Sequence, residues 1–419
     1  MKRTILAVSV CLSVVPSGAY AVDWSLNSTL SQTVELNDNP FLRAVAAGTL
    51  SSYSTILANA TARTPTSKFL FDGSIGYQKY WGPGVDGAPS ENLTGGANLH
   101  YETYGKNNSD RQYLDAGWHR QSTAFALLGQ LAIVTNTRGF LDTTTVGGGI
   151  DRSITALDTV SLSAHSTYTS YDPGTGGTPF IDTSTNGTWR HRVNSIASLT
   201  ASSDAEFLHF DNVLNTDITI LRENVGVDAT LSPLLSFRGT AGVAYVQTER
   251  GSPAFSLPSS VPNASSSGSI AGFITNAVLT YKMFPDTTLS LTGVRSISPS
   301  AVGSLVELTS IGAGLTRNVN SRQTLSFAAD ASRTTSSGTT SDFLSGSIIY
   351  NYLLTKEWTA QFSYRHLHRF ATSGTGSAGF IVDPITGILI PLASGIGPAD
   401  SNSIMMVVSR SVSILPDGN

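Results

Sequence analysis

The chain has 419 residues, a formal net charge of −4 and a single cysteine, Cys11. Its mean hydropathy is +0.03, and no segment is apolar over the roughly 20 residues that a membrane-spanning helix needs. These values argue against a basic nucleic-acid-binding surface, a scaffold held by disulfides and a bundle of transmembrane helices. We therefore expect no nucleic acid among the partners.

The first 21 residues have the three regions of a secretory signal peptide. Lys2 and Arg3 precede an apolar stretch over 5–15, Pro16 and Gly18 follow, and the sequence AYA ends at Ala21. A membrane anchor would need about 20 apolar residues, so this stretch is too short for one. The sequence predicts export with cleavage near Ala21, which leaves a cysteine-free domain over 22–419.

Residues 22–37, VDWSLNSTLSQTVELN, alternate between two chemically different faces. One face carries the large apolar residues, and every residue of the other face is polar. Strict alternation indicates a strand with one apolar face and one wet face. Strands of soluble sheets usually have about 5–6 residues, so this one is too long for an ordinary sandwich.

The same pattern recurs to the carboxyl end of the chain. It predicts strands over 22–36, 47–63, 68–80, 93–106, 111–124, 142–155, 158–171, 188–202, 205–216, 218–231, 235–249, 268–283, 287–299, 303–317, 322–335, 341–354, 357–370 and 401–415. These strands number eighteen, and 16–18 strands are compatible with the pattern.

The connections between the expected strands differ in length in a regular way. Short turns such as 64–67, 107–110 and 232–235 occur at every second junction. Long connections lie between them, over 81–92, 172–187, 250–267 and 371–400, although the junction near 217 is short where a long one is expected.

Such alternation places all the turns and both termini at one end of the sheet. Outer-membrane barrels have this layout, with periplasmic turns and external loops. Closure is expected because an open sheet edge in lipid would leave backbone groups unpaired. We predict an all-β fold, a transmembrane antiparallel up-and-down β-barrel of about 18 strands. A soluble protein with several sheets is the alternative, but it would need many short strands.

One face of each strand is expected to point into the lumen. The lumen residues predicted from this register are Asp23, Glu35, Asp72, Glu102, Asp115, His119, Asp151, His165, Arg192, Arg222, Asp228, Arg238, Lys282, Asp330 and Arg365, with His100 and His209 between them. Barrels of about 16–18 strands leave an aqueous channel unless they are plugged. Because neither sign of charge dominates, the lining suits neutral or weakly charged polar solutes. The alternative is a narrow or blocked lumen filled by salt bridges.

The sequence contains no segment that points to catalysis. The sequence YRHLHRF over 364–370 places His366 and His368 on one strand face, but no third metal ligand is evident. Phe362 and Tyr364 share that face and are expected to contact lipid, so we place these histidines at the level of the external headgroups. We predict that the protein is not an enzyme and has no metal site and no cofactor.

The signal peptide, a first strand ending in VELNDNPF (34–41) and the paired long strands resemble a family of β-barrel porins of proteobacteria. Members are similar to outer-membrane proteins encoded near exopolysaccharide or exosortase systems. The resemblance covers the whole mature chain, and its local motif is DNP at 38–40. It implies a location in the outer membrane of a Gram-negative bacterium, surrounded by outer-membrane lipid, and assembly by the barrel assembly machinery. The last strand departs from the usual aromatic end, because it finishes on Ile414 and Leu415.

Two functions are compatible with such a barrel. The first is a porin-like channel for hydrophilic solutes, with a saccharide or exopolysaccharide implied by the resemblance alone. The second is a non-conducting surface or assembly barrel that displays its external loops. Within 371–400, FIVD and ILIPL flank PITG, which predicts a β-hairpin. That hairpin would either extend beyond the membrane or narrow the mouth of the channel.

Overall fold

The computed structural model describes residues 22–40, 42, 45–83, 90–105, 110–122, 139–172, 178–212, 215–250, 268–299, 305–336, 339–370, 380–382, 389–391 and 398–415. Eighteen strands form one sheet, as predicted. The expected signal peptide lies outside the described residues, and no helix among those described is long and apolar enough to cross a membrane.

The strands of this sheet have the following bounds: β1 (Asp23–Asn37), β2 (Thr49–Arg63), β3 (Ser67–Trp81), β4 (Glu91–Tyr104), β5 (Arg111–Ser122), β6 (Phe140–Ser153), β7 (Asp158–Tyr171), β8 (Phe180–Arg192), β9 (Ala197–Phe210), β10 (Thr216–Ser232), β11 (Leu235–Arg250), β12 (Gly268–Phe284), β13 (Thr287–Pro299), β14 (Leu305–Asn320), β15 (Gln323–Ser336), β16 (Thr339–Leu353), β17 (Trp358–Arg369) and β20 (Ala399–Leu415).

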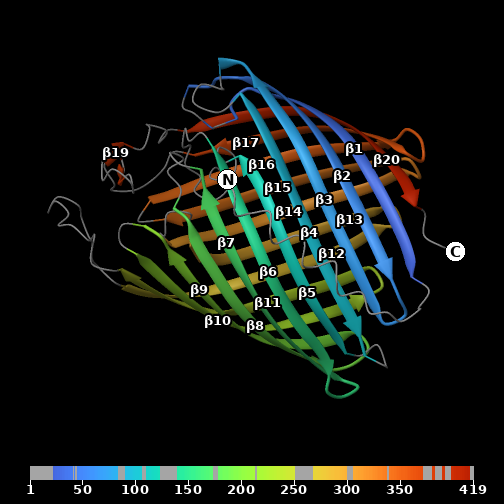
Figure 1. Cartoon of the computed structure of the whole chain (residues 1–419), viewed down its shortest axis with the longest axis vertical. Coiled ribbons are helices and arrows are strands. Elements are labelled where there is room, and N and C mark those ends of the chain that lie inside the picture. The colour runs from blue at the N-terminus through green and yellow to red at the C-terminus, as the bar shows by residue number, and fades with distance from the viewer. Residues whose placement is uncertain are drawn as a thin grey trace.

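The sheet is closed into an antiparallel barrel. β1 pairs with β2 on one side and with β20 on the other, and every other strand pairs with its neighbours in chain order. The closing register runs from Leu26 opposite Leu415 to Asn37 opposite Ser403. Figure 1 shows the strands tilted around the barrel axis. The fold class predicted from the alternation is therefore confirmed.

Short turns gather at one end of the barrel, which we call the turn end. The connections at 64–66, 233–234 and 285–286 lie there, as do the start of β1 and the end of β20. The opposite end, the loop end, holds the longer connections, such as the one between Arg250 and Gly268. Between β17 and β20, β18 (Phe380–Val382) and β19 (Leu389–Pro391) pair with each other, which confirms the predicted hairpin.

Two strands lie elsewhere than predicted. The sequence placed strands over 188–202 and 205–216, whereas β8 and β9 are joined by a turn at 193–196. Asn194 makes that turn, because its Oδ1 accepts the backbone N–H groups of Ile196 and Ala197 at 2.9 and 2.8 Å. Residues 180–187 are therefore strand rather than loop, and the long connection predicted over 172–187 is wrong in its second half. The connection near 217 moves to 211–215 at the loop end, so the alternation of turns and loops is regular.

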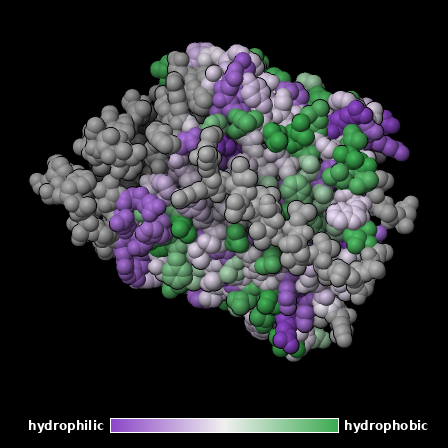
Figure 2. Space-filling view, in the orientation of Figure 1, coloured by the Kyte–Doolittle hydropathy of each residue, from purple (hydrophilic) through white to green (hydrophobic). Residues whose placement is uncertain are grey.

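The outer face of the barrel carries the large apolar side chains. Trp24, Leu36 and Ile311 are 54%, 59% and 69% exposed, and similar residues cover the other strands. Figure 2 shows apolar residues spread over the visible side and strongly hydrophilic residues mainly near its edges. At the turn end, the Arg410 guanidinium lies 5.6 Å from the Trp358 ring and pairs with Glu357 at 3.0 Å. Aromatic and snorkelling basic side chains are expected where an apolar belt meets water.

The two faces predict opposite responses to an introduced charge. Val146 is 59% exposed on the outer face of β6, and Thr145 is on the inner face, where its hydroxyl is 3.2 Å from that of Thr167. Arginine on the lipid face near the membrane centre costs about 2–4 kcal/mol. We expect Val146→Arg to lower the free energy of unfolding in lipid by about this amount and Thr145→Arg to lower it much less.

Val243→Arg provides an internal comparison for this experiment. Val243 also lies on the outer face, but Glu223 is directly opposite on β10. Because that carboxylate would pair with the new guanidinium, Val243→Arg should cost less than Val146→Arg. Equilibrium unfolding in lipid that ranked Thr145→Arg as the most costly of the three would contradict the assignment of faces.

Candidate functional site in the barrel lumen

The inner face is the side of each strand opposite the exposed apolar residues, and it is mainly polar. Its acidic residues are Asp23, Glu35, Asp72, Glu102, Asp115, Asp151, Asp182, Asp204, Glu206, Asp228 and Asp330. Its basic residues are Arg63, Lys68, Arg111, Arg190, Arg192, Arg222, Arg238, Lys282, Arg365 and Arg369. Among the described residues eleven acidic side chains thus face ten basic ones, so the lumen carries almost no net charge.

All fifteen charged and histidine residues singled out from the sequence lie on this inner face. His119 and His165 lie on the inner face because their partners on the adjacent strands, Gly96 and Gly147, occupy inner positions. His209 was also expected in the lumen, and that expectation is wrong. The inner positions of β9 near the loop end are the buried Leu208 and Phe210, so His209 points outward, where its Nδ1 lies 2.7 Å from Asp217 Oδ1.

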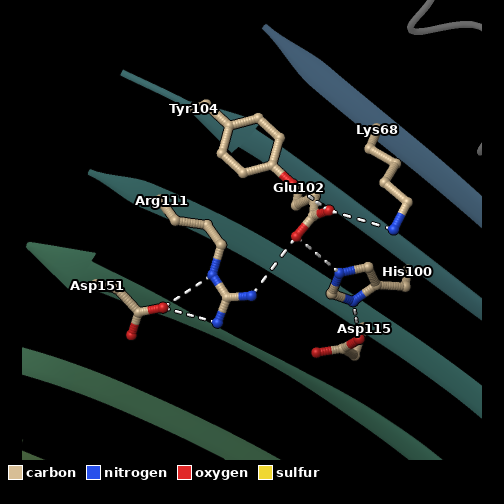
Figure 3. A network of polar contacts seen from close by, with 7 residues as sticks. All are labelled: Lys68, His100, Glu102, Tyr104, Arg111, Asp115 and Asp151. Atoms are coloured by element: carbon tan, nitrogen blue, oxygen red, sulfur yellow. Dashed lines mark hydrogen bonds and ion pairs between the residues drawn. The ribbon is translucent and has the colours of Figure 1, made fainter. Parts of the chain in front are cut away.

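A network of charges lies on the inner face of β3 to β6 near the turn end (Figure 3). Its centre is Glu102, whose side chain is only 6% exposed. Lys68 Nζ and Arg111 Nη1 each lie 3.6 Å from a Glu102 carboxylate oxygen, and His100 Nε2 lies at 3.5 Å. Tyr104 donates its hydroxyl hydrogen to the same carboxylate. One hydroxyl donor and three nitrogen groups from three strands thus surround one buried carboxylate at the barrel wall.

The network continues sideways through two further carboxylates. Arg111 donates from Nε and Nη2 to Asp151 Oδ2 at 2.8 and 2.7 Å, and its guanidinium lies 5.1 Å from the Tyr113 ring. On the other side, His100 Nδ1 lies 2.5 Å from Asp115 Oδ1. Each charge faces an opposite or hydrogen-bonding group on an adjacent strand, so the wall is lined by short-range ion pairs rather than by one sign of charge.

Three further arginines make ion pairs elsewhere in the lumen, Arg222 and Arg238 with an adjacent strand and Arg365 across β20. Arg222 Nη1 lies 2.6 Å from both Asp204 Oδ1 and Glu206 Oε2, between β9 and β10. Arg238 pairs with Asp228 at 2.8 Å on the neighbouring strands. Arg365 Nη2 lies 3.8 Å from Glu35 Oε1.

Several inner residues were missed from the sequence, each for a local reason. Asp182 fell into the predicted loop over 172–187, and Asp204 into the predicted turn between two misplaced strands. Lys68 and Arg111 stand at the first positions of predicted strands, where an assignment of faces is weakest. Lys68 and Arg111 could have been placed in the lumen by counting residues, because side chains an even number of positions apart share one face of a strand. Lys68 shares its face with Asp72, and Arg111 shares its face with Asp115.

The inner face also contains an apolar region that the sequence reading did not predict. Leu208, Phe210, Ile218, Ile220, Ala244, Val246 and Ile274 face inward near the loop end of β9 to β12 and form a buried cluster with Ile297. The polar lining expected throughout the lumen is therefore interrupted on this side.

The two histidines of YRHLHRF lie on the outer face at the loop end, as expected from the pattern. His368 Nδ1 lies 2.7 Å from Asp400 Oδ1, and His366 Nδ1 lies 2.9 Å from Asn402 Oδ1. Asn402 in turn donates from its backbone and side chain to the Asp38 carboxylate, at 2.7 Å each. This cluster joins β17, β20 and the residues after β1. Among the described residues no group of three or more His, Cys, Asp or Glu side chains is arranged to hold a metal ion.

A closed barrel of eighteen antiparallel strands with an apolar exterior has the fold of the outer-membrane β-barrels. The solved structure of OccK2 (OpdF) from Pseudomonas aeruginosa is similar, with a TM-score of 0.50 and 8% identity over 94% of this chain and 98% of that one. The FrpB iron transporter from Neisseria meningitidis (F5-1 variant) also has a TM-score of 0.50 and 8% identity, over 93% and 82% of the two chains. At this identity the likeness concerns the fold alone. No protein-family model and no curated protein matches the sequence.

The burial of Glu102 predicts a specific loss of stability. Glu102→Ala would remove the carboxylate shared by Lys68, His100 and Arg111 and the acceptor of the Tyr104 hydroxyl. A hydrogen bond to a charged group is worth about 1.5–3 kcal/mol, and we expect a loss of this size. Glu357→Ala is the control, because that carboxylate is 50% exposed and pairs with one arginine, a contact worth about 0.2–1 kcal/mol. Equilibrium unfolding in lipid should show the larger loss for Glu102→Ala, and equal losses would contradict a structural role for the network.

Proposed function

We propose that the protein is an outer-membrane channel for hydrophilic solutes. The observation that carries this proposal is the solvent exposure of charged side chains on the inner face. Arg238, Arg365 and Asp115 are 70%, 57% and 43% exposed although they point into the barrel. Side chains in a filled interior would be buried, so these values support a lumen that holds water.

The near balance of inner charges supports a preference for neutral or weakly charged solutes. Because many of the inner charges are paired with an opposite charge nearby, the fields of the two partners largely cancel away from the wall. Hydroxyl and amide groups of Ser, Thr and Asn fill the spaces between the pairs and offer hydrogen bonds without net charge. A saccharide fits this lining, and the resemblance to porins found with exopolysaccharide systems is the support for that narrower proposal.

In this proposal the barrel lies in the outer membrane of a Gram-negative bacterium, with the turn end in the periplasm. The Arg410–Trp358–Glu357 group would then sit at the periplasmic interface, and the His366–His368–Asp400 group at the external headgroups. Assembly by the barrel assembly machinery belongs to the same proposal. The alternative, a non-conducting barrel that displays loops, predicts the same membrane location but no current.

Planar-bilayer recording of refolded protein separates these two functions. We expect steady, ohmic current steps at moderate voltage from a channel. Protein that is shown to be folded by heat-modifiable migration and circular dichroism, yet stays silent, would favour the display barrel.

The lumen network also predicts the ion preference of that current. Glu102→Gln removes one negative charge from the inner wall and should shift the reversal potential in a potassium chloride gradient toward the anion. Glu357→Gln removes the same charge from the outside of the barrel and should leave the reversal potential unchanged. An equal shift in both variants would show that the inner network does not face the conducting path.

A further inference from the structure

The barrel wall divides near the loop end between β12 and β13. Pairing of these strands begins at Thr275 opposite Arg295 and continues toward the turn end. Above this point, residues 268–274 of β12 stay paired with β11 only, and residues 296–299 of β13 stay paired with β14 only. Two sheet edges that should meet in a regular barrel therefore lie apart.

The freed end of β13 lies inside the barrel, against the inner side of β10 to β12. Ile297 is 5% exposed and belongs to the cluster formed by the inward-facing residues Ile218, Val246 and Ile274. A Cβ placed on Gly272 would come within 2.4 Å of Ile297 Cδ1, so the absence of a side chain there makes room for Ile297. Arg222 Nη2 reaches the Ile297 carbonyl oxygen at 3.4 Å from the inner face of β10.

The wall under this strand end differs from the rest of the lumen. Leu208, Phe210, Ile218, Ile220 and Val246 form a continuous apolar surface, each at most 4% exposed. In a water-filled lumen such a surface is favourable only when something apolar covers it, and here Ile297 and Leu305 do so.

Acidic side chains border this apolar wall on the adjacent strand positions, on the side of the turn end. Asp182 is opposite Leu208, Glu206 is opposite Ile220, and Asp204 is opposite Arg222. Arg222 pairs with Asp204 and Glu206, and Asp182 Oδ1 is buried with no hydrogen-bond partner among the described residues. Two carboxylates thus pair with one guanidinium, and a third carboxylate on the neighbouring strand keeps an open acceptor.

We propose that this wall is a binding site for amphipathic cations, with the apolar part of the solute on β9 to β12 and the cationic group beside Asp182 and Glu206. The end of β13 covers the site in the present structure and is displaced when the solute binds. Displacement breaks no pairing with β12, because residues 296–299 have no partner on that strand. They are paired with residues 305–308 of β14, so the ends of β13 and β14 move together. The inference rests on the proposed channel function, since the solute reaches the site through the lumen.

Channel block by matched small ions tests the site. Hexyltrimethylammonium, added on the loop side, should reduce the current at about tenfold lower concentration than tetramethylammonium, because its chain buries apolar surface. Hexanesulfonate has the same chain and the opposite charge and should be as weak as tetramethylammonium. If hexyltrimethylammonium blocks the current at the same concentration as tetramethylammonium or hexanesulfonate, the proposal is overturned.

Two sets of variants locate the effect. Ile220→Ser should weaken the block by hexyltrimethylammonium about tenfold through loss of apolar contact, whereas Val225→Ser, on the outer face of the same strand, should not.

In a Cys11→Ser background, Gly272→Cys with Ile297→Cys should form a disulfide that holds β13 over the wall. The oxidised protein should lose the block and regain it after reduction, while each single cysteine variant should behave like the parent. Block that is unchanged by the disulfide would overturn displacement of β13.

Failure of the channel and failure of the site give different results. Folded protein with no current contradicts the channel, and calorimetric titration of hexyltrimethylammonium into the barrel in nanodiscs then tests the site alone. Measurable binding that is lost in Ile220→Ser and kept in Val225→Ser supports the site, and absence of binding overturns it. A steady current indifferent to hexyltrimethylammonium contradicts only the site.

Discussion

Closure of the sheet through the hydrogen bonds between β1 and β20 is the constraint on which the other features of the molecule depend. A hydrocarbon environment offers no partners to backbone groups, so each strand must be paired on both sides. Once the sheet is closed, successive side chains must point alternately to lipid and to the lumen. The chemistry of the interior is then fixed by every second residue, and residues far apart in sequence, such as Glu35 and Arg365, become neighbours.

Closure also determines how polar side chains on the outer face are tolerated. Glu223 is exposed on the outer face of β10, where it accepts a hydrogen bond from Ser203 at 2.7 Å. Gln32 on β1 is bonded in the same way to Ser52 and Ser54 of the neighbouring strand. In each case the partner lies on an adjacent strand and faces outward, because the register brings side chains of one face together. Such pairs reduce the cost of polar groups in the apolar belt.

The sequence was sufficient for the strand count, the two ends of the barrel and the faces of most strands, because each depends on local alternation and on connection length. It was insufficient for β8 and β9, where the turn at 193–196 depends on the Asn194 side chain and interrupts the alternation only briefly. The inward orientation of Leu208 and Phe210 could not be predicted from the alternation of polar and apolar residues. Alternation assigns apolar residues to lipid, whereas the pairing of β9 with β10 puts these side chains on the face of Arg222, where they pack with Ile297 of β13.

The same contact lies where the barrel wall is open between β12 and β13. Where β12 and β13 part, Ile297 fills the space beside Gly272, and Arg222 donates to a carbonyl oxygen that has no partner on β12. The apolar inner wall is thus a consequence of the missing pairing, since a strand end that leaves the sheet must pack its side chains on another surface. Beside it, Arg222 is paired with Asp204 and Glu206 of the neighbouring strand, so the lumen combines one apolar side with a polar lining of nearly balanced charge. A solute that passes through meets hydroxyl, amide and paired charged groups on most of the wall and an apolar surface on one side only.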